Sequence, residues 1–506
     1  MAILPAPQAS GGRRTALRKV LLTIGLALLG IVPFLRVADP NLWLDEVLTY
    51  RVATAPWGEH LELVYRTYDH PPLFFHLIWL LGRFTESPAV LGMMPAFCVV
   101  GAGGVLAWSL WRSEPVALRR QTVGLFAAMF ALCPELSYQA WNLRHYGFWL
   151  LMGSFYLAAW GEALRGNARA HRISPLFAGL ALLTHHFTVF PVAVAELAGG
   201  WILWRSNSNL YRQTFLSRLL LFIPFAIAWC AVAWAQYPGS GGELVGRLLS
   251  YQGLPALKEV WGRFHGAPAV LDLPWWQSAA ALGVGVLLLG FDIARLRRAE
   301  PAERFWFAVA YLPLAAVFAL SLFTPALASR FLAISAAALM ALHARSLVRA
   351  GRWGYTAAGV AMAVMAMGLG FQLTRPAEYP PYSEYIPRIL ETVKKGEVLV
   401  LPPGSMPDVY LYHARRASVA MPASISIPVP VLGRDRFEAA MDALPGQLAP
   451  YRRAWVVYEL PRFWDPENRT QTFFEKSWTI GPYQSLWEKR WVLTYYDNPR
   501  LNRPGT

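Results

Sequence analysis

Cysteine is scarce in this sequence. The 506 residues contain three cysteines, Cys98, Cys133 and Cys230, and each lies within an apolar run. A disulfide framework or a cysteine metal site needs several cysteines at set spacings in polar segments. The segments between the apolar runs therefore offer neither, and we expect all three cysteines to be packing residues.

A glycine-rich phosphate-binding loop and an internal repeat are also missing from the sequence. The glycines of Gly101-Ala102-Gly103-Gly104 lie inside an apolar run, where small residues allow helices to approach closely. No convincing small-residue cleavage site follows the first apolar run, which leads into Arg36-Val37-Ala38-Asp39. That run therefore predicts an uncleaved membrane anchor.

The positive charge of the chain forms no continuous basic face. Lys and Arg number 46 against 31 Asp and Glu, which gives a net charge of +15. A nucleic-acid-binding protein concentrates such an excess on one surface, whereas here the arginines occur in small groups between apolar segments. Nucleic acid is therefore excluded as a partner, and the arginines indicate membrane topology.

Apolar residues are abundant. They make up 55% of the chain, aromatic residues make up 14%, and the mean hydropathy is +0.33. This exceeds the usage of an ordinary soluble domain and predicts a polytopic α-helical membrane protein. Several runs are shorter than the ~20 residues that span a bilayer, so their ends must extend into flanking residues. The eleven runs are Val20–Leu35, Pro88–Trp111, Val123–Leu136, Tyr146–Trp160, Ile173–Leu183, Phe187–Trp204, Leu219–Ala235, Ser278–Gly290, Phe305–Phe323, Phe331–Ala341 and Gly354–Phe371.

The distribution of arginine predicts the orientation of these runs. Arg13, Arg14, Arg18 and Lys19 place the N-terminus in the cytoplasm, because cytoplasmic connections carry an excess of Lys and Arg. With eleven crossings, every later arginine group then falls on the cytoplasmic side. These groups are Arg112/Arg119/Arg120, Arg165/Arg169/Arg172, Arg205/Arg212/Arg218, Arg295/Arg297/Arg298 and Arg345/Arg349/Arg352.

One further apolar stretch, Pro71–Phe84, is not counted as a crossing. Counting it would move every later arginine group outside, so it predicts a re-entrant or interfacial helix within the first outer loop, residues 36–87. The same count gives the other connections outside the membrane. They are Ser137–His145, Thr184–His186, Gln236–Gln277 and Thr324–Ser329.

The composition changes after Phe371 to proline, tyrosine and charge. We expect two domains, a membrane part at residues 1–373 and an extracytoplasmic α/β domain at residues 374–506. Pro422–Pro430 should be a loop or a sheet edge, because proline cannot donate to a strand ladder. The predicted elements are helices at Ser383–Lys395 and Asp408–His413 and strands at Glu397–Leu401, Ala454–Glu459 and Trp491–Tyr496.

Asp45 and Glu46 are the leading candidates for catalysis, in the polar loop after the first apolar run. Side chains of adjacent helical residues diverge by about 100°, so the two carboxylates cannot act on one atom. We expect one to act on the substrate and the other to pair or cap. The competing interpretation is a solvated loop edge, or charges at a helix N-terminus after Asn41. Asp69 adds a third acid, directly before His70.

Cationic side chains occupy other outer helix ends. Arg144 and His145 follow Tyr138 at one such end and can grip a phosphate, although Trp, Tyr and Arg at a helix end also serve as interfacial anchors. His185-His186 can donate to a phosphate, whereas a shared metal is disfavoured because adjacent helical histidines diverge. Arg330 lies on the outer side against the positive-inside rule, which an anionic partner would explain.

The order of these motifs resembles the GT-C class of membrane glycosyltransferases, in particular the branch that contains protein O-mannosyltransferases and lipid A aminoarabinose transferases. The resemblance lies in Asp45-Glu46, His70-Pro71-Pro72-Leu73, the Arg144 region and Ser329-Arg330-Phe331-Leu332. Two positions depart from these branches. Phe74-Phe75 stands where the mannosyltransferases have Gly-Lys, and His70 stands where the aminoarabinose transferases have Lys.

The resemblance implies an inverting transfer of a sugar from a polyprenyl-phosphate carrier to an extracytoplasmic acceptor, which is a lipid, a glycan or a protein. Asp45 would be the general base and Glu46 its support. The enzyme would lie in the inner or plasma membrane, in contact with membrane lipid, with its site outside the cytoplasm. The expected substrate-binding residues are Asp69, His70, Tyr138, Arg144, His145, His185, His186 and Arg330.

Other functions stay open at this point. A divalent metal is one open possibility, because Asp45, Glu46 and Asp69 offer oxygen ligands, although no spacing enforces a metal site. A flippase or transporter of lipid-linked saccharides would place ionisable groups at mid-membrane depth, where the sequence shows few. A lipid-linked saccharide polymerase or ligase is a further alternative, and a non-catalytic scaffold would need no outward acids.

Overall fold

The chain forms two compact units in a computed structural model. The structure describes residues 10–37, 41–67, 70–236, 253–268, 270, 273–323, 327–374, 381–402, 407–428, 434–459, 468–482, 484–487, 491–499 and 501. The helical unit contains the described residues up to 37, Ala53–Gln236 and those from 253 to 374. The α/β unit contains residues 41–52 and those from 381 onward, so the predicted boundary near residue 373 leaves out the segment that carries Asp45. The two units are described separately.

The helical unit is built from long apolar helices. Among the described residues, seven are long and apolar enough to cross a membrane, or eight if the bent pair α6 and α7 forms one span. The long helices are α1 (Ser10–Ile31), α5 (Pro88–Ser113), α6 (Val116–Leu132), α7 (Pro134–Trp141), α8 (Tyr146–Ala163), α9 (Ala168–Leu182), α10 (Val189–Ser206), α11 (Ser208–Gln236), α14 (Trp275–Leu296), α15 (Pro301–Ser321), α16 (Ala333–Arg349) and α17 (Arg352–Thr374).

Ten of the eleven predicted apolar runs each fall mainly on one of these helices, and Val123–Leu136 is divided between α6 and α7, so the count of eleven crossings is not confirmed. Helix α9 has 15 residues, which gives about 22 Å at 1.5 Å per residue, less than the ~30 Å hydrocarbon core. The run Val123–Leu136 is broken by a 63° bend between α6 and α7. Pro134 at the start of α7 explains the bend, because the residue before a proline avoids the helical region.

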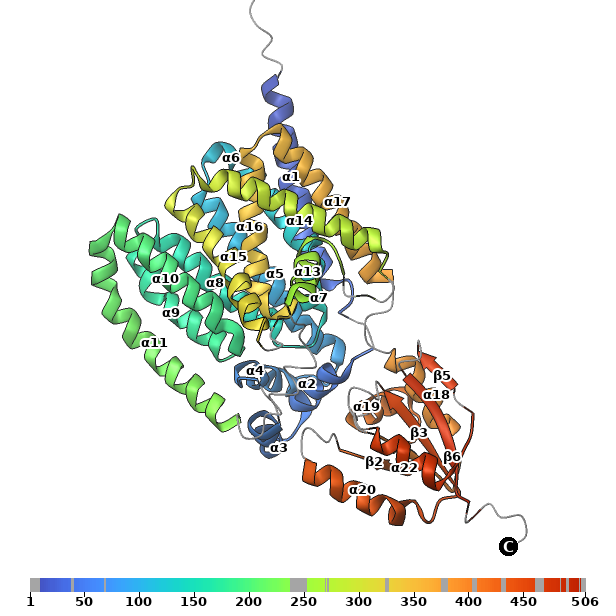
Figure 1. Cartoon of the computed structure of the whole chain (residues 1–506). Helices are drawn as coiled ribbons and strands as arrows, with labels where there is room; N and C mark the ends of the chain where they lie inside the picture. The colour runs from blue at the N-terminus through green and yellow to red at the C-terminus, as the bar shows by residue number, and fades with distance from the viewer. Residues whose placement is uncertain are drawn as a thin grey trace, which may run out of the picture. The chain divides into compact units, whose positions relative to one another are not determined.

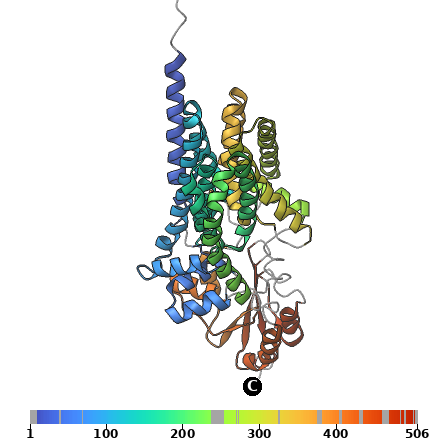
Figure 2. The same cartoon turned by 90° about the vertical axis from the view of Figure 1, so that its left-hand side faces the viewer.

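Close helix packing depends on small residues. A Cβ atom on Gly25 of α1 would come within 2.2 Å of the Gly124 carbonyl oxygen on α6, so both helices need glycine at this crossing. Gly103 of α5 serves the same purpose, since its Cβ would lie 2.6 Å from a Leu29 methyl. Figure 2 shows α1, in blue, running alongside its neighbours. Alanine dominates α16, which is almost fully buried at the centre of the unit (Figure 1).

Ion pairs tie several helix ends together. Glu114, which follows α5 and has no exposed side-chain surface, contacts Arg345 Nε at 2.6 Å and Arg349 Nη2 at 2.9 Å. Arg349 and Arg295 also contact Glu303, at 3.4 and 3.3 Å. These arginines were predicted only as topology signals. The structure gives them partners on α5 and α15 as well.

An unpredicted helix, α13 (Gly253–His265), lies in the connection Gln236–Gln277. Its Ala256, Val260 and Phe264 side chains are buried in the core of the helical unit. The Gln277 amide donates to the carbonyl oxygens of Gly266 and Val364, at 2.7 and 3.0 Å. Part of this connection therefore packs among the helices.

Short helices follow α1. They are α2 (Leu44–Thr54), α3 (Trp57–Glu62) and α4 (Leu73–Gly82), with the 3-10 helix η1 (Val32–Phe34) and the π-helix η2 (Leu63–Thr67). Helix α4 has 10 residues, about 15 Å, which is too short to span a bilayer. This length agrees with the prediction that Pro71–Phe84 is not a crossing. Trp79 and Arg83 of α4 donate to the Ala55 carbonyl oxygen.

The α/β unit is a mixed sheet with helices. The strands follow the order β2-β1-β3-β6-β4, with β5 also paired to β6, and β1 is parallel to both β2 and β3. The elements are α18 (Tyr382–Thr392), β1 (Glu397–Leu401), α19 (Pro407–Ala417), β2 (Ser424–Ser426), α20 (Arg434–Leu448), β3 (Arg453–Glu459), α22 (Arg469–Ser477), β4 (Thr479–Ile480), β5 (Gln484–Trp487) and β6 (Trp491–Asp497) (Figure 1).

The predicted elements of this unit are present. Strand β1 has the predicted bounds, and its residues are all buried, as expected for a parallel strand covered on both faces. The proline-rich stretch Pro422–Pro430 contributes the edge strand β2, as predicted, and its last two residues lie outside the described part. Helices α20 and α22 and strands β4 and β5 were not predicted.

Candidate functional site

Four connections of the helical unit meet at one end of the bundle. They bring together His70, Arg144, His145, His185 and Arg330, which we call the Arg144 cluster. The Arg144 guanidinium lies 3.0 Å from His70 Nε2, and the His70 ring is 4.4 Å from His145 and 5.8 Å from His185. All four connections were predicted to be outer connections, so their meeting agrees with that grouping.

The His-Pro-Pro-Leu motif is fixed by the end of α9. Pro71 and Pro72 lead directly into α4, and the Leu73 amide donates to the Leu183 carbonyl oxygen at 3.0 Å. This bond ties the start of α4 to the His185 connection, which positions His70 beside His185.

The Arg144 segment links α7 to α8. Helix α7 ends at Trp141, and the Arg144 amide donates to the Asn142 carbonyl oxygen at 2.7 Å, which turns the chain back into α8. A Cβ atom on Gly147 would meet the Pro95 carbonyl oxygen at 2.7 Å, so glycine lets α8 approach α5 here. Arg144 and His145 are thereby buried.

A set of hydrogen bonds holds the His185 connection. His185 Nδ1 accepts from the Phe187 amide at 3.0 Å, and the Thr188 hydroxyl donates to the His185 carbonyl oxygen at 2.6 Å. The Trp149 indole stacks on the His185 ring at 4.7 Å and donates to the Thr188 hydroxyl. His185 Nε2 is buried and has no hydrogen-bond partner in the part of the chain that the structure describes.

Arg330 comes from the 3-10 helix η4 (Ser329–Leu332) before α16. The next residue, Phe331, stacks on Phe187 at 4.4 Å and lies 5.4 Å from the His185 ring. The Arg330 guanidinium carbon lies 5.2 Å from the Phe331 ring. The packing of Phe331 against Phe187 and His185 therefore positions the neighbouring Arg330 near the cluster.

The histidines of the cluster are held in the neutral form. Burial lowers the pKa of His70, His145 and His185 well below the ordinary value, and the charges of Arg144 and Arg330 and the neighbouring imidazoles lower each pKa further. His145 is 0% exposed, and neither ring nitrogen has a hydrogen-bond partner among the described residues. An unsatisfied buried polar group costs about 1–3 kcal/mol. The arrangement suits an anion, which would accept hydrogen bonds and raise these pKa values.

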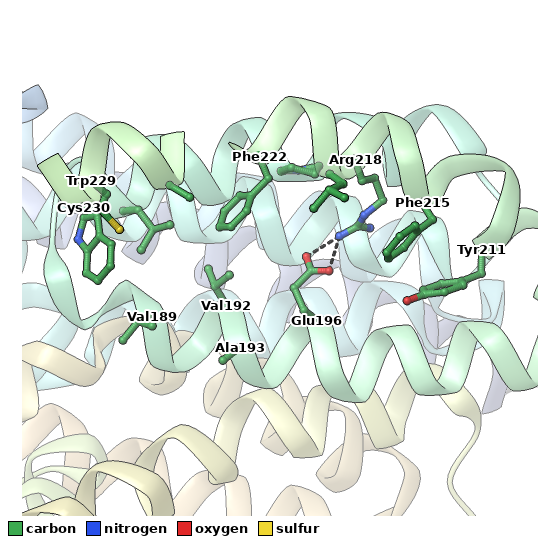
Figure 3. Close-up of a pocket in the computed structure, with 14 residues that line it drawn as sticks. Val189, Val192, Ala193, Glu196, Tyr211, Phe215, Arg218, Phe222, Trp229 and Cys230 are labelled. Carbon is green, nitrogen blue, oxygen red and sulfur yellow. Dashed lines mark hydrogen bonds and ion pairs between the residues drawn. The ribbon is translucent and has the colours of Figure 1, made fainter. Parts of the chain in front are cut away.

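A pocket opens close to this cluster. His186 is the neighbour of His185, and the Trp229 indole donates to His186 Nδ1 at 2.9 Å. Trp229 and Val189 line the pocket, which lies between α9, α10 and α11 and has a volume of about 390 Å³. Figure 3 shows Trp229 at one end and Tyr211 at the other.

The pocket is mainly apolar but contains one ion pair. Arg218 of α11 donates to both carboxylate oxygens of Glu196 on α10, and the Tyr156 hydroxyl donates to Glu196 at 2.8 Å (Figure 3). The remaining lining side chains are aliphatic or aromatic, with Cys230 beside Trp229. The sequence did not indicate this pocket.

Asp45 and Glu46 belong to the α/β unit, at the start of α2. Glu46 is 3% exposed and its carboxylate accepts from the Trp43 amide at 3.1 Å. This is one half of a capping box, in which an acid at the third helical position caps the helix start. Asp45 is half-buried, and its carbonyl oxygen accepts from the Thr49 hydroxyl. Glu46 therefore supports the helix, and the catalytic role of Asp45 stays a prediction.

The remaining predicted residues divide as follows. Asp69 lies outside the described residues. Tyr138 is half-buried on α7, and its role stays a prediction. Across the described residues, no three His, Cys, Asp or Glu side chains are grouped to hold a metal ion.

A second histidine group was missed in the sequence. His265, Asp292, Tyr311 and His343, which we call the Asp292 cluster, lie on α13 to α16, and all but the half-buried Tyr311 are buried. His343 Nδ1 is 2.8 Å from Asp292 Oδ2, and the Tyr311 hydroxyl donates to the same oxygen at 2.7 Å. These groups lie on helices of the membrane part, and the expectation of few ionisable groups at mid-membrane depth stays a prediction. The signal was an isolated acid in an apolar helix, which by itself suggests a role.

The chain has the fold of a known membrane glycosyltransferase. It superposes on the crystal structure of ArnT from Cupriavidus metallidurans in the apo state with a TM-score of 0.54 and 12% identity, covering 96% of this chain and 98% of that one. ArnT is an aminoarabinose transferase of the GT-C class, so the predicted resemblance in fold is confirmed. No family model and no curated protein matches the sequence.

Two further solved structures are similar at lower scores. The oligosaccharyltransferase from Archaeoglobus fulgidus, solved with zinc and sulfate, has a TM-score of 0.46 and 12% identity, covering 94% of this chain and 73% of that one. The arabinofuranosyltransferase AftD from Mycobacteria has a TM-score of 0.49 and 14% identity, covering 95% of this chain and 40% of that one.

Proposed function

We propose that the protein is an integral-membrane glycosyltransferase that moves a sugar from a polyprenyl-phosphate carrier to an acceptor hydroxyl outside the cytoplasm. The observation that carries the proposal is the Arg144 cluster. Arg144 and Arg330 lie near three imidazoles, of which those of His145 and His185 are buried, and no described residue bonds to the ring nitrogens of His145. A bound phosphate would bring negative charge and hydrogen-bond acceptor oxygens to this set.

The phosphate also has a chemical role in the transfer. As the bond between the anomeric carbon and the phosphate oxygen breaks, negative charge grows on the phosphate. Cations and N–H donors placed beforehand in a site with little water stabilise that charge. Arg144, Arg330 and the imidazoles of His70, His145 and His185 would do this, and bidentate arginine contacts suit phosphate geometry.

The pocket beside the cluster supports a lipid carrier. An isoprenoid chain is apolar, and the pocket presents Val189, Val192, Phe222 and Trp229 along α10 and α11. The bond between Trp229 and His186 places one end of the pocket next to the His185 connection. A phosphate at the cluster could therefore continue into an isoprenoid chain in the pocket.

The acceptor requires a base. In the proposed step, the Asp45 carboxylate takes the proton of the acceptor hydroxyl, and the acceptor oxygen attacks the anomeric carbon from the face opposite the phosphate. The new glycosidic bond forms as the bond to phosphate breaks, and the electron pair leaves with the phosphate oxygen. The products are an inverted glycoside, polyprenyl phosphate and a protonated Asp45. Glu46, through its contact with Trp43, keeps the helix start in place.

The Asp45→Asn substitution tests this proposal. The amide is nearly isosteric but cannot accept the proton, so transfer should fall by ~10²–10⁴-fold while donor binding is kept. The assay is release of polyprenyl phosphate from polyprenyl-phosphate sugar by the purified protein in detergent with an envelope acceptor fraction. Wild-type turnover in this variant would remove Asp45 from the mechanism.

The proposal includes a cytoplasmic N-terminus and an outside C-terminal domain, because the arginine groups follow the positive-inside rule. Reporter fusions after Arg120 and after Thr506 should then report opposite sides of the membrane. The same side for both fusions would contradict the proposed topology.

A transporter is the second candidate, and the Asp292 cluster is the observation that favours it. Buried Asp and His chains occur in pumps and transporters. In detergent there are no compartments to transport between, so a transporter would release no polyprenyl phosphate. Absence of release with every acceptor fraction, together with lipid movement in liposomes, would establish the transporter instead.

A further inference from the structure

We infer that the α/β unit positions the proposed catalytic base, by holding the amino-terminal part of α2 against α18 and α19. This inference rests on the proposed function for the role of Asp45. It assigns a task to the C-terminal part of the chain, whose Asp408, Tyr412 and His413 become positioning residues.

The segment before α2 is bound first. His413 Nε2 lies 3.0 Å from the Leu42 carbonyl oxygen, and both residues are buried. Burial lowers the pKa of His413 to about 4, so the ring is neutral near pH 7 and donates through Nε2–H. The Asn41 side chain in turn accepts from the Ser383 amide at the start of α18, at 3.0 Å. Two bonds therefore fix the chain three and four residues before Asp45.

The body of α2 is bound as well. Arg51 contacts the Asp408 carboxylate at 2.8 Å, and Tyr50 meets Tyr412 edge-on at 5.3 Å. Burial raises the pKa of Tyr412, and the nearby Arg416 opposes the rise. Arg51 and Tyr50 of α2 therefore both contact α19.

These contacts all involve one stretch of α19. His413 meets Leu42, Tyr412 meets Tyr50, and Asp408 meets Arg51. The same helix therefore contacts both the residues before α2 and the body of α2. The contacts span sequence separations of 357 and 371 residues, so the docking is a tertiary interaction and not a local turn.

The geometry of docking has a catalytic consequence. Contacts at both ends of residues 42–51 restrict sliding of the helix along its axis and rotation about it. The Asp45 side chain is therefore held in one orientation. A misplacement of about 1 Å can cost ~10²-fold in rate. Loosening α2 should therefore lower kcat, whereas the KM for donor, set by the Arg144 cluster and the pocket, should stay the same.

The test is His413→Phe in the full-length protein, with His413→Gln as its matched control. Phenylalanine keeps the packing beside Tyr382 and Tyr412 but cannot donate to Leu42, whereas glutamine can place an N–H near the same point. We expect His413→Phe to lower kcat by about 10- to 100-fold with donor KM within about 2-fold, and His413→Gln to recover most of the loss. Equal loss in both variants, or a loss carried by KM, would overturn the positioning role.

Hydrogen exchange distinguishes positioning from general unfolding. In His413→Phe the amides of α2 should exchange about 10-fold faster, while those of β1 and β3 keep their protection. Unchanged exchange in α2 would contradict the inference whatever the rate. If the α/β unit does not fold in this variant, the exchanged charges Arg51→Asp and Asp408→Arg provide the second test, since the double variant should restore the kcat lost by each single one.

The experiments distinguish failure of the proposed function from failure of the positioning role. If Asp45→Asn keeps wild-type turnover, the proposed base is wrong, although α2 could still be held by α19. If Asp45→Asn is inactive and His413→Phe loosens α2 without lowering kcat, the proposed function stands and the positioning role is rejected.

Discussion

The helical unit contains two buried histidine groups that differ in how their polar atoms are paired. In the Asp292 cluster, His265 Nε2 lies 3.2 Å from His343 Nε2, His343 Nδ1 lies 2.8 Å from Asp292, and His265 Nδ1 lies 2.7 Å from the Trp261 carbonyl oxygen. In the Arg144 cluster, His145 has no ring-nitrogen partner among the described residues. The Asp292 cluster therefore includes a carboxylate that pairs with its histidine, whereas the Arg144 cluster combines imidazole N–H donors with two arginines.

The difference separates a polar network that stabilises the fold from one suited to a ligand. A buried network whose charges are paired internally fixes the packing of its helices, and removing one partner leaves a buried charge. A network with unsatisfied donors costs stability until a ligand binds. Substitutions in the two clusters should therefore have opposite effects on stability and on donor binding.

The largest effect is expected from Asp292→Ala. It leaves His343 and Tyr311 without their acceptor, and breaking a buried pair costs about 3–5 kcal/mol. Thermal unfolding in detergent should show a lower midpoint, while the affinity of the folded fraction for donor is unchanged. If the variant had normal stability but bound donor more weakly, the Asp292 cluster would be a substrate-binding site, and the proposed difference between the two clusters would be wrong.

The next effect is expected from Arg330→Ala. Loss of a charged hydrogen bond to phosphate should weaken donor binding or slow transfer by roughly 1.5–3 kcal/mol. Arg352→Ala is the matched control, since Arg352 also lies over an aromatic ring, that of Trp353, but on another helix. Titration with donor lipid measures both variants. Lipid phosphate release unchanged by Arg330→Ala would keep the enzyme and reject the phosphate clamp.

A pH dependence of smaller size is expected for donor binding. Burial, Arg144 and Arg330 lower the pKa of His145 and His185, so these rings are neutral without a ligand. A phosphate raises these pKa values, so binding takes up protons and tightens as the pH falls from 8 to 6, by at most about tenfold per pH unit for each proton. Calorimetry in buffers of different ionisation enthalpy measures the uptake. Affinity independent of pH would mean that the imidazoles do not meet the phosphate.

The linked effect on stability has the opposite sign. A histidine whose folded pKa lies below its unfolded value of about 6.5 contributes fully above that pH and loses its contribution as the pH falls below it. The ligand-free protein should therefore unfold more easily at pH 5.5 than at pH 7.5. Bound donor should reduce that difference, which a pair of melting curves can show.

The smallest effect on stability is expected from His145→Phe. It replaces an unsatisfied buried ring with an apolar one beside Phe74 and Phe75, so the free energy of unfolding should be unchanged or rise by up to about 1 kcal/mol. Donor binding should weaken. His343→Phe is the matched substitution in the Asp292 cluster and should destabilise, because the Asp292 carboxylate then loses the imidazole that contacts it. Equal destabilisation by both would remove the distinction between the clusters.

Sequence patterns were sufficient for the properties that depend on local composition. Hydropathy located the apolar helices, and the arginine groups placed the four connections of the Arg144 cluster on one side, where the structure brings them together. The same rule identified Arg330 as an exception. The number of crossings is less certain from sequence, because the break at Pro134 and the short helix α9 depend on the neighbouring helices.

The properties that escaped prediction depend on residues far apart in the chain. The docking of α2 joins Arg51 to Asp408, and the Asp292 cluster joins four helices. In the sequence, each of these residues is an isolated polar side chain without a visible partner. Helix α13 was hidden because it is short and amphipathic, with only one face buried against the other helices.

The ion pairs of Glu114 have a consequence for biosynthesis. Glu114 and its partner Arg345 are separated by 231 residues. At 5–20 residues per second, the ribosome needs roughly 10–50 s to make the intervening chain. During that time the carboxylate must remain hydrated or find a temporary partner, because an unpaired charge is costly to bury. A nascent chain interrupted before α16 would lack both arginines that pair with this acid.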